Sequence, residues 1–266
     1  MNTHTSTSSA QTSNSLRGWL TAPVPTSAFQ ANIQQLRRSW FKLMANTSAV
    51  FGLAVIVLLV LVAILAPLIA THDIGTNNLA NRLQPPSWGH FFGTDELGRD
   101  IFSRLVYGSR ITLYIVTLTA VIAAPIGLVV GTTAGYMGGW VDTALMRIVD
   151  IFLAFPSLVL ALSFAAALGP GIENAVIAIS LAAWPPIARL ARAETLTIRS
   201  SDYVAAIRLQ GASTMRVITK HVVPMCIPSV VIRITLNMSS IILTAAGLGF
   251  LGLGAQPPSP EWGAML

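Results

Sequence analysis

Residues 189–221 read RLARAETLTIRSSDYVAAIRLQGASTMRVITKH and form a basic, polar segment between two apolar ones. The segment carries six Lys and Arg residues against two acids, Glu194 and Asp202. A loop this basic between membrane spans is expected on the cytoplasmic side. Residues 203–211 have a helical pattern that ends at Gly211, which predicts a short helix followed by a tight turn. Such a helix is a candidate docking element for a soluble partner.

The composition of the whole chain is that of a membrane protein. Hydrophobic residues make up 53% of its 266 residues and charged residues only 10%, whereas a soluble domain carries about 25% charge. The mean hydropathy is +0.68. A spanning helix needs roughly 20 apolar residues. The charge-free runs therefore predict an all-α, polytopic membrane protein with about five transmembrane helices, at residues 48–70, 111–135, 148–168, 174–191 and 229–252.

The chain is expected to divide into a tail, residues 1–35, and a transmembrane domain, residues 36–266. The tail is rich in Ser, Thr, Asn and Gln, which predicts a disordered segment. Residues 32–42 fit two interpretations. They form either a short amphipathic helix on the inner membrane surface, anchored by Trp40 and Phe41, or a plain linker.

The distribution of charge predicts the orientation in the membrane. Arg37, Arg38 and Lys42 stand just before the first span, which places the N-terminus in the cytoplasm. Five crossings then put 11 of the 16 Lys and Arg residues inside and four outside. The net charge of +6 is therefore interpreted as a membrane-orientation signal, and no nucleic-acid partner is expected.

Glycines in the predicted spans mark helix faces that allow close packing. The candidate packing residues are Gly127, Gly131 and Gly135 in one run and Gly247, Gly249 and Gly252 in another. Ordinary packing and a surface that slides as the protein changes state both fit this pattern. Charges in the spans are few, and Asp150 is expected to pair with Arg147 on its own helix.

Signals for catalysis, cofactors and metals are weak in this sequence. The four histidines, His4, His72, His90 and His221, are scattered, so no metal site is expected. The chain lacks GxxxxGK[ST] and so has no phosphate-cradling loop of its own. No span carries a chain of carboxylates, and no catalytic constellation lies in a buried context. These observations disfavour a stand-alone secondary carrier and a membrane enzyme.

Residues 203–224, YVAAIRLQGASTMRVITKHVVP, resemble the EAA loop of ABC importer permeases. Further matches are FGTDELGRDIFSRLVYGSRITL (residues 92–113), VDIFLAFPSLVLAL (residues 149–162) and GLGFLGLGAQPPSPEWGAML (residues 247–266). Together they resemble the second permease subunit of dipeptide, oligopeptide and nickel importers. The resemblance covers nearly everything from about residue 35 onward.

The resemblance implies a type I ABC importer permease fold in a bacterial inner membrane. Its implied partners are a sister permease subunit, two ABC ATPase subunits that bind ATP and Mg, and a periplasmic solute-binding protein. The implied solute is a dipeptide, an oligopeptide or a similar small molecule, with a nickel or metal chelate as the alternative. The coupling loop would be residues 189–223. The residues expected to carry ATPase coupling are Asp202, Tyr203, Ala205, Ala206, Arg208, Gly211, Ala212, Ser213, His221 and Pro224.

The sequence also departs from the family pattern. Ala205 stands where the family has Glu, Ile207 replaces the second Ala, and His221 takes a hydrophobic place before the Pro. Family members usually have six spans, whereas five are predicted here, with the C-terminus outside. Two explanations of the missing sixth helix fit the sequence: the chain is a truncated product, or it naturally lacks this helix.

The segment between the first two predicted spans, residues 72–110, is long and mixed in charge. It includes TDELGRD, in which Asp95 and Glu96 are expected to cap a helix through residues 101–107. The resemblance suggests an outer docking face for the binding protein. A structural re-entry into the second span fits equally well.

Overall fold

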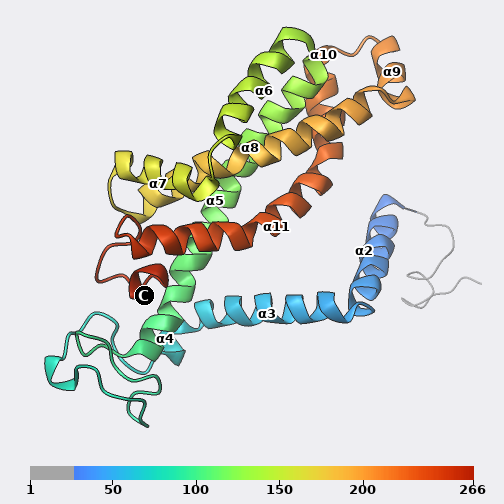
Figure 1. The fold of residues 1–266 in the computed structure, drawn as a ribbon. Coiled ribbons are helices and arrows are strands. Elements are labelled where there is room, and N and C mark those ends of the chain that lie inside the picture. Colours follow the sequence, from blue (N-terminus) through green and yellow to red (C-terminus); the bar gives the residue numbers. More distant parts are fainter. Residues whose placement is uncertain (1–26) are drawn as a thin grey trace, which may run out of the picture. The chain divides into compact units, whose positions relative to one another are not determined.

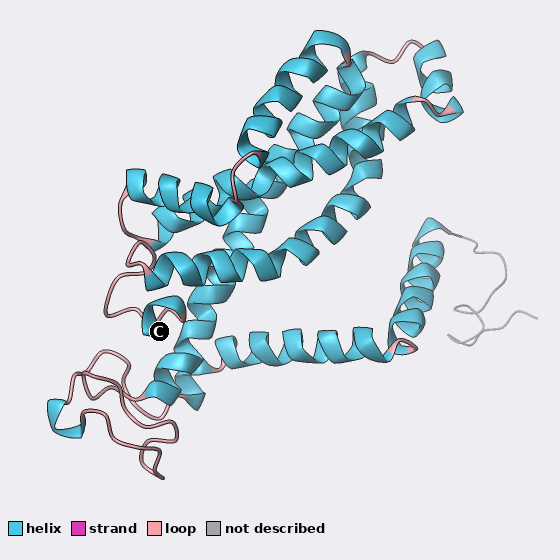
Figure 2. Cartoon of the chain, viewed as in Figure 1, coloured by secondary structure: helices cyan, strands magenta, loops and turns pink. Residues whose placement is uncertain are grey.

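The computed structural model describes residues 27–266, so most of the predicted disordered tail lies outside the described part of the chain. Contacts divide the chain into two units, Met1–Leu59 and Val60–Leu266. The described helices and loops are distinguished in Figure 2. Between residues 27 and 266 no β-strand is formed, in agreement with the all-α prediction.

The first unit consists of α2 (Ala28–Met44) and the first part of α3 (Thr47–Ile64). Helix α2 begins earlier than the predicted end of the tail at residue 35, because Ser27 caps it. The Ser27 hydroxyl accepts a hydrogen bond of 3.1 Å from the backbone N–H of Gln30. Of the two interpretations of residues 32–42, the helix is confirmed, with Trp40 and Phe41 more than half exposed.

The second unit is a bundle built on α5 and α8 (Figure 1). Its long helices are joined by short connections, and α9 and α10 form a small excursion between α8 and α11. The elements in chain order are α4 (Ala66–Ile69), a 3-10 turn (Leu79–Asn81), α5 (Ile101–Met137), α6 (Gly139–Leu153), α7 (Ser157–Leu168), α8 (Ile172–Arg199), α9 (Asp202–Leu209), α10 (Thr214–Val217), a π-helical turn (Ile218–Val222), α11 (Val223–Phe250) and a last 3-10 turn (Gly263–Met265).

Helices α5 and α8 approach closely along a glycine face. A Cβ atom added at Gly127 would lie 2.7 Å from the Ile187 Cβ, and one at Gly135 would lie 2.8 Å from the Arg192 carbonyl oxygen. At Gly131 an added Cβ would overlap the carbonyl oxygen of Ala188. The absence of side chains on this face therefore lets the two backbones touch, as expected for small residues in membrane helices.

The second glycine run has three different roles. A Cβ at Gly247 would lie 3.3 Å from the Leu158 side chain, so this residue faces α7. Gly249 makes room for Glu261 and Ala264 of the C-terminal segment. Gly252, in contrast, has φ +74° and no atom within 4 Å of an added Cβ, so it forms the turn after α11 instead of a packing contact.

Among residues 27–266, four helical segments are long and apolar enough to cross a membrane: α3, α5, α8 and Thr214–Phe250, which includes α11. Helices α6 and α7 would together supply a fifth span, but they are bent by 90° at the break between them. The break lies at residues 154–156, where Pro156 adopts an extended conformation before α7. The predicted span 148–168 is therefore not one straight helix.

Two other helices extend beyond the predicted spans because they include charged residues. Helix α5 begins at Ile101, and its first turns contain Arg104 and Arg110, which a search for charge-free runs excludes. Helix α8 continues to Arg199 through Arg189 and Arg192, so the first part of the predicted coupling loop is helical. Pro185 and Pro186 are accommodated inside α8 without ending it.

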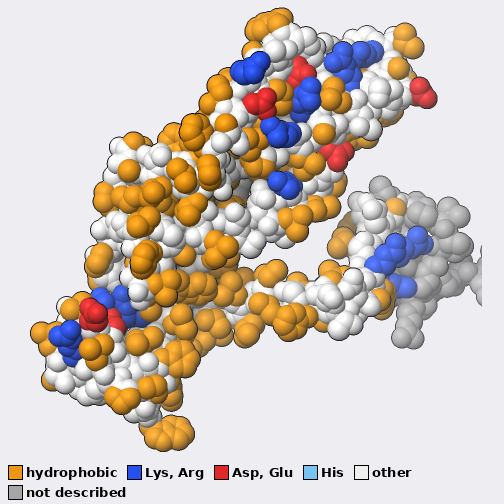
Figure 3. All heavy atoms as spheres, in the orientation of Figure 1, with side chains coloured by type: hydrophobic (Ala, Val, Ile, Leu, Met, Phe, Trp, Pro, Cys, Tyr) orange, Lys and Arg blue, Asp and Glu red, His pale blue; other side chains and the backbone are white. Residues whose placement is uncertain are grey.

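Charged segments lie at both ends of the second unit (Figure 1). Residues 70–100 lie at the end where α5 begins, and α9 lies at the opposite end, where α8 ends. Lys and Arg side chains gather over the α9 end, and hydrophobic side chains predominate between the two ends (Figure 3). This separation agrees with placing the two segments on opposite sides of a bilayer.

Candidate functional site

The predicted docking helix exists as α9, and its apolar anchor is a buried valine. Ser201 is its N-cap and accepts a hydrogen bond from the backbone N–H of Val204. Val204 is fully buried in a cluster with Ile198 at the end of α8 and with Val217 and Val222 before α11. The burial of Val204 fixes the short helix against the ends of both long helices, so a displacement of α9 would be transmitted to them.

The turn after α9 depends on Gly211. Its φ of +82° lies in the left-handed region, and its N–H donates to the Arg208 carbonyl over 2.9 Å. Ser213 then adopts an extended conformation before α10. No atom lies within 4 Å of a Cβ added at Gly211, so backbone conformation, and not crowding, selects glycine here.

Two polar contacts fix the orientation of α9. The Arg208 Nε donates to the Tyr136 hydroxyl over 2.9 Å, and the guanidinium lies 4.9 Å from the centre of the Tyr136 ring. The Tyr203 hydroxyl and the His221 Nδ1 are 2.7 Å apart. Arg208 and Tyr203 therefore connect α9 to α5 and to the π-helical turn before α11, which the sequence alone did not predict.

The remaining surface of α9 and its turn is exposed. Ala205 and Ala206 face away from the bundle, as do Asp202, Ser213 and Pro224. Leu209 is 89% exposed and Met215 is 69% exposed. These two apolar side chains were absent from the sequence-predicted set, although their place beside Gly211 could have indicated them. Exposed apolar groups on a polar, cationic surface are typical of a protein contact.

Ion pairs join α6 to α8 beside this surface. Arg192 forms a bidentate pair with Asp142, with distances of 2.5 and 2.6 Å. Asp150 pairs with Arg189 over 2.5 Å, and the predicted pairing of Asp150 with Arg147 is therefore wrong. Helix α6 packs against α8, which a pattern within one helix could not indicate.

A cavity of about 230 Å³ lies between α7, α8 and α11, and its α8 side is lined by apolar residues. Its polar lining comes mainly from one face of α11, where Arg233, Asn237, Ser240 and Thr244 recur at helical spacing. Between residues 27 and 266 no carboxylate forms an ion pair with Arg233. Polar groups on a membrane helix usually face a protein interior or a water-filled path.

Two aspartates, Asp95 and Asp100, stabilise the segment that precedes α5. Asp100, and not Asp95 or Glu96, caps α5, because its carboxylate accepts from the Ser103 N–H over 2.8 Å. Burial would raise the pKa of Asp100, but hydrogen bonds from Ser103 and His90 outweigh it and lower that pKa. For Asp95, burial also tends to raise the pKa, but hydrogen bonds from Arg99 lower it below its usual value. Both carboxylates are thus stabilised in the charged form.

Comparison with known proteins places this geometry in a family. A model described as "Binding-protein-dependent transport system inner membrane component" matches residues 123–266, more than half of the chain. The chain belongs to this family. A second model, described as the N-terminal TM domain of oligopeptide transport permease C, matches residues 34–86. The chain is therefore a multi-pass membrane permease of the ABC importer class, and such a permease works with ATPase subunits.

Individual relatives cover most of this permease. It is 42% identical over 245 residues to the dipeptide transport system permease protein DppC of Alkalihalophilus pseudofirmus, covering 92% of this chain and 80% of the relative. It is 46% identical over 220 residues to the probable D,D-dipeptide transport system permease protein DdpC of Escherichia coli, covering 83% and 72%. A solved structure of the MetNI methionine ABC transporter in an inward-facing conformation has a similar fold, with a TM-score of 0.52 and 25% identity over 58% of this permease and 77% of that chain.

Proposed function

We propose that this permease carries short peptides across the bacterial inner membrane as one of two membrane subunits of an ABC importer. The observation that carries this proposal is its high identity, over most of its length, to relatives named as dipeptide permeases. A nickel chelate is not favoured as the solute. The N-terminus lies in the cytoplasm, a sister permease completes the solute path, and a periplasmic protein delivers the solute.

Energy enters this complex through the segment around α9. Two ATPase subunits bind ATP and Mg, and one of them contacts the exposed surface that includes Ala205, Leu209 and Met215. Because Val204 is buried between α8 and the start of α11, movement of α9 displaces both helices. The chain itself needs no cofactor for this role.

Reconstitution tests the proposed division of labour. The purified chain alone is expected to hydrolyse no ATP, because nucleotide chemistry lies in the partner subunits. Proteoliposomes are then prepared that also contain the sister permease and both ATPases. They should take up a radiolabelled dipeptide when ATP is supplied on the side of the ATPases and the binding protein on the opposite side. ATP hydrolysis by the isolated chain, or uptake that does not require the ATPases, would contradict this assignment.

We further propose that the polar face of α11 lines the solute path and that Arg233 binds the carboxylate of the peptide. Its guanidinium has no carboxylate partner among residues 27–266, and Asn237, Ser240 and Thr244 continue the polar face along the helix. A charge-assisted hydrogen bond contributes about 1.5–3 kcal/mol. Arg233→Ala should therefore reduce dipeptide uptake by roughly 10- to 100-fold.

The control for Arg233 uses the charge of the solute. Arg233→Lys keeps the positive charge and should retain more uptake than Arg233→Ala. Uptake of a dipeptide amide, which lacks the carboxylate, should be low in the unaltered permease and should change little in the Ala variant. An equal loss for both solutes would assign Arg233 to structure and not to solute binding.

A further inference from the structure

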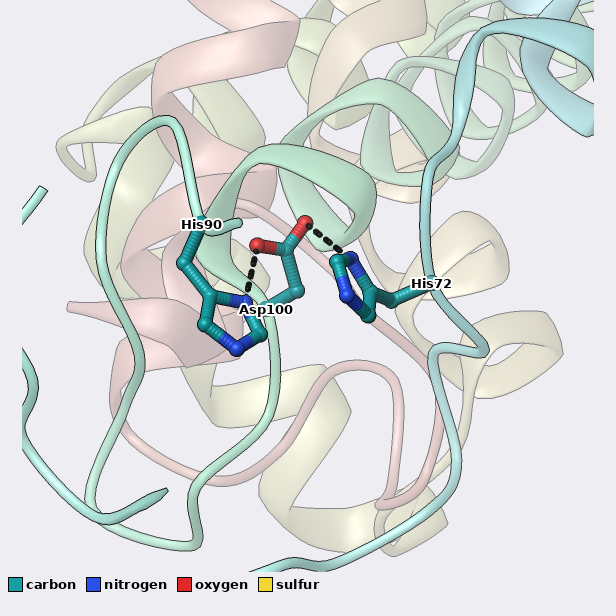
Figure 4. A group of neighbouring side chains, drawn as sticks. All are labelled: His72, His90 and Asp100. Carbon is teal, nitrogen blue, oxygen red and sulfur yellow. Dashed lines mark hydrogen bonds and ion pairs between the residues drawn. The ribbon is translucent and has the colours of Figure 1, made fainter. Parts of the chain in front are cut away.

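Three side chains that are far apart in the sequence meet beside the start of α5 (Figure 4). Asp100 lies between His72 and His90, and one ligand atom from each residue lies within 4.8 Å of the others. The His90 Nδ1 is 2.9 Å from one Asp100 oxygen, and the His72 Nδ1 is 3.9 Å from the other. The two imidazole rings are 4.5 Å apart between centres. The folding of residues 72–100 creates this cluster, which explains why the scattered histidines predicted no site.

Among residues 27–266, no Lys or Arg forms an ion pair with Asp100. The Asp100 side chain has no exposed surface, and in the described part of the chain its ion-pair partners are the two histidines. Arg99 and Arg104 both pair with Asp95 instead. Hydrogen bonds from Ser103 stabilise the carboxylate, and a metal ion held by the two imidazoles would add the positive charge that Lys and Arg do not supply there.

We propose that His72, His90 and Asp100 bind a divalent transition-metal ion of the zinc type. Ligand atoms about 2.0–2.2 Å from a tetrahedral Zn²⁺ lie roughly 3.3 Å from one another. The two imidazole nitrogens face different Asp100 oxygens, at 2.9 and 3.9 Å, so the side chains must shift to place both nitrogens and one oxygen around the same ion. Two imidazoles and one carboxylate are ligands that zinc accepts, and three protein ligands leave its fourth position for water or a partner.

The surroundings of the cluster support its individual ligands. The Ser103 hydroxyl donates to an Asp100 oxygen over 2.7 Å, and the Ser103 N–H donates to the same oxygen, so the carboxylate is fixed before a metal arrives. His90 is 15% exposed and His72 is 42% exposed, so an ion can enter past His72. A metal here would hold residues 72–100 against α5. The site lies outside the cavity along α11, so it concerns a resident ion and not the transported solute.

Zinc titration of the purified full chain tests this proposal. After treatment with EDTA, the chain is titrated with ZnCl₂ in competition with a chromophoric chelator. We expect one Zn²⁺ per chain, with X-ray absorption showing two imidazole nitrogens among the ligands near 2.0 Å. His72→Gln and Asp100→Asn should each weaken binding at least about 10-fold. Asn retains an oxygen that can cap α5, and His72 is partly exposed, so neither change should unfold the chain.

A matched histidine control distinguishes this cluster from adventitious binding. His221→Gln removes a histidine at the other end of the bundle, next to Tyr203, and should leave zinc affinity unchanged. Circular dichroism establishes that each variant is folded. Zinc binding that survives His72→Gln and Asp100→Asn, that is lost in His221→Gln, or that is absent from the unaltered chain would overturn the proposal.

Discussion

Replacing Gly211 with Val abolishes solute uptake by the assembled importer while the permease still inserts into the membrane. Gly211 has φ +82°, and a β-branched residue adopts that conformation only at a high energetic cost. The Val variant therefore loses the turn between α9, which ends at the exposed Leu209, and α10, which contains the exposed Met215. Solute uptake and solute-stimulated ATP hydrolysis are measured in proteoliposomes at equal permease content.

Gly211→Asn is the matched variant, because Asn tolerates the left-handed region far better than Val. No atom lies within 4 Å of an added Cβ, so the Asn side chain has room at this position. The Asn variant should retain a substantial part of the uptake. Normal uptake in Gly211→Val, or an equal loss in both variants, would remove the backbone conformation of this turn from the coupling mechanism.

The sequence predicts the helices of this permease better than their ends. Apolar runs locate the spanning helices because burial in lipid requires them. Helix ends depend on caps and on charges that the fold pairs. Asp100 starts α5 ten residues before the charge-free run, because Arg104 donates to the backbone carbonyl of Ile74 and does not face lipid. Pro156 marks a possible break in the sequence, and the 90° bend lies there, but a proline alone does not specify a bend, since α8 keeps Pro185 and Pro186 inside the helix.

In the candidate site, too, local features could be predicted from the sequence and long-range contacts could not. The helix 203–211 and the turn at Gly211 follow from local pattern, and the structure contains both. The contact of Arg208 with Tyr136 links residues on two different helices, and no single-sequence pattern specifies it. The histidine cluster has the same origin, since His72, His90 and Asp100 meet only through the path of the outer segment.

Replacing Gly131 with Leu should separate α5 from α8 and destabilise the permease. A Cβ at this position would overlap the Ala188 carbonyl oxygen and lie 2.7 Å from the Ala191 Cβ, and backbone atoms cannot move away as a flexible side chain can. Overpacking of this kind costs about 1–3 kcal/mol or more. We expect the melting temperature of the detergent-purified chain to fall by roughly 2–12 °C, with a lower yield of assembled complex.

Gly52→Leu is the control, because it adds the same side chain to a glycine on another candidate membrane helix. No atom lies within 4 Å of a Cβ added at Gly52, so this change should leave the melting temperature nearly unchanged or raise it slightly. Differential scanning fluorimetry with a thiol-reactive dye would report on Cys226, which is buried in the folded chain. If Gly131→Leu and Gly52→Leu have equal melting temperatures, α5 and α8 do not require backbone contact at Gly131. If only Gly131→Leu loses stability, close approach at this glycine holds together the pair of helices on which the second unit is built.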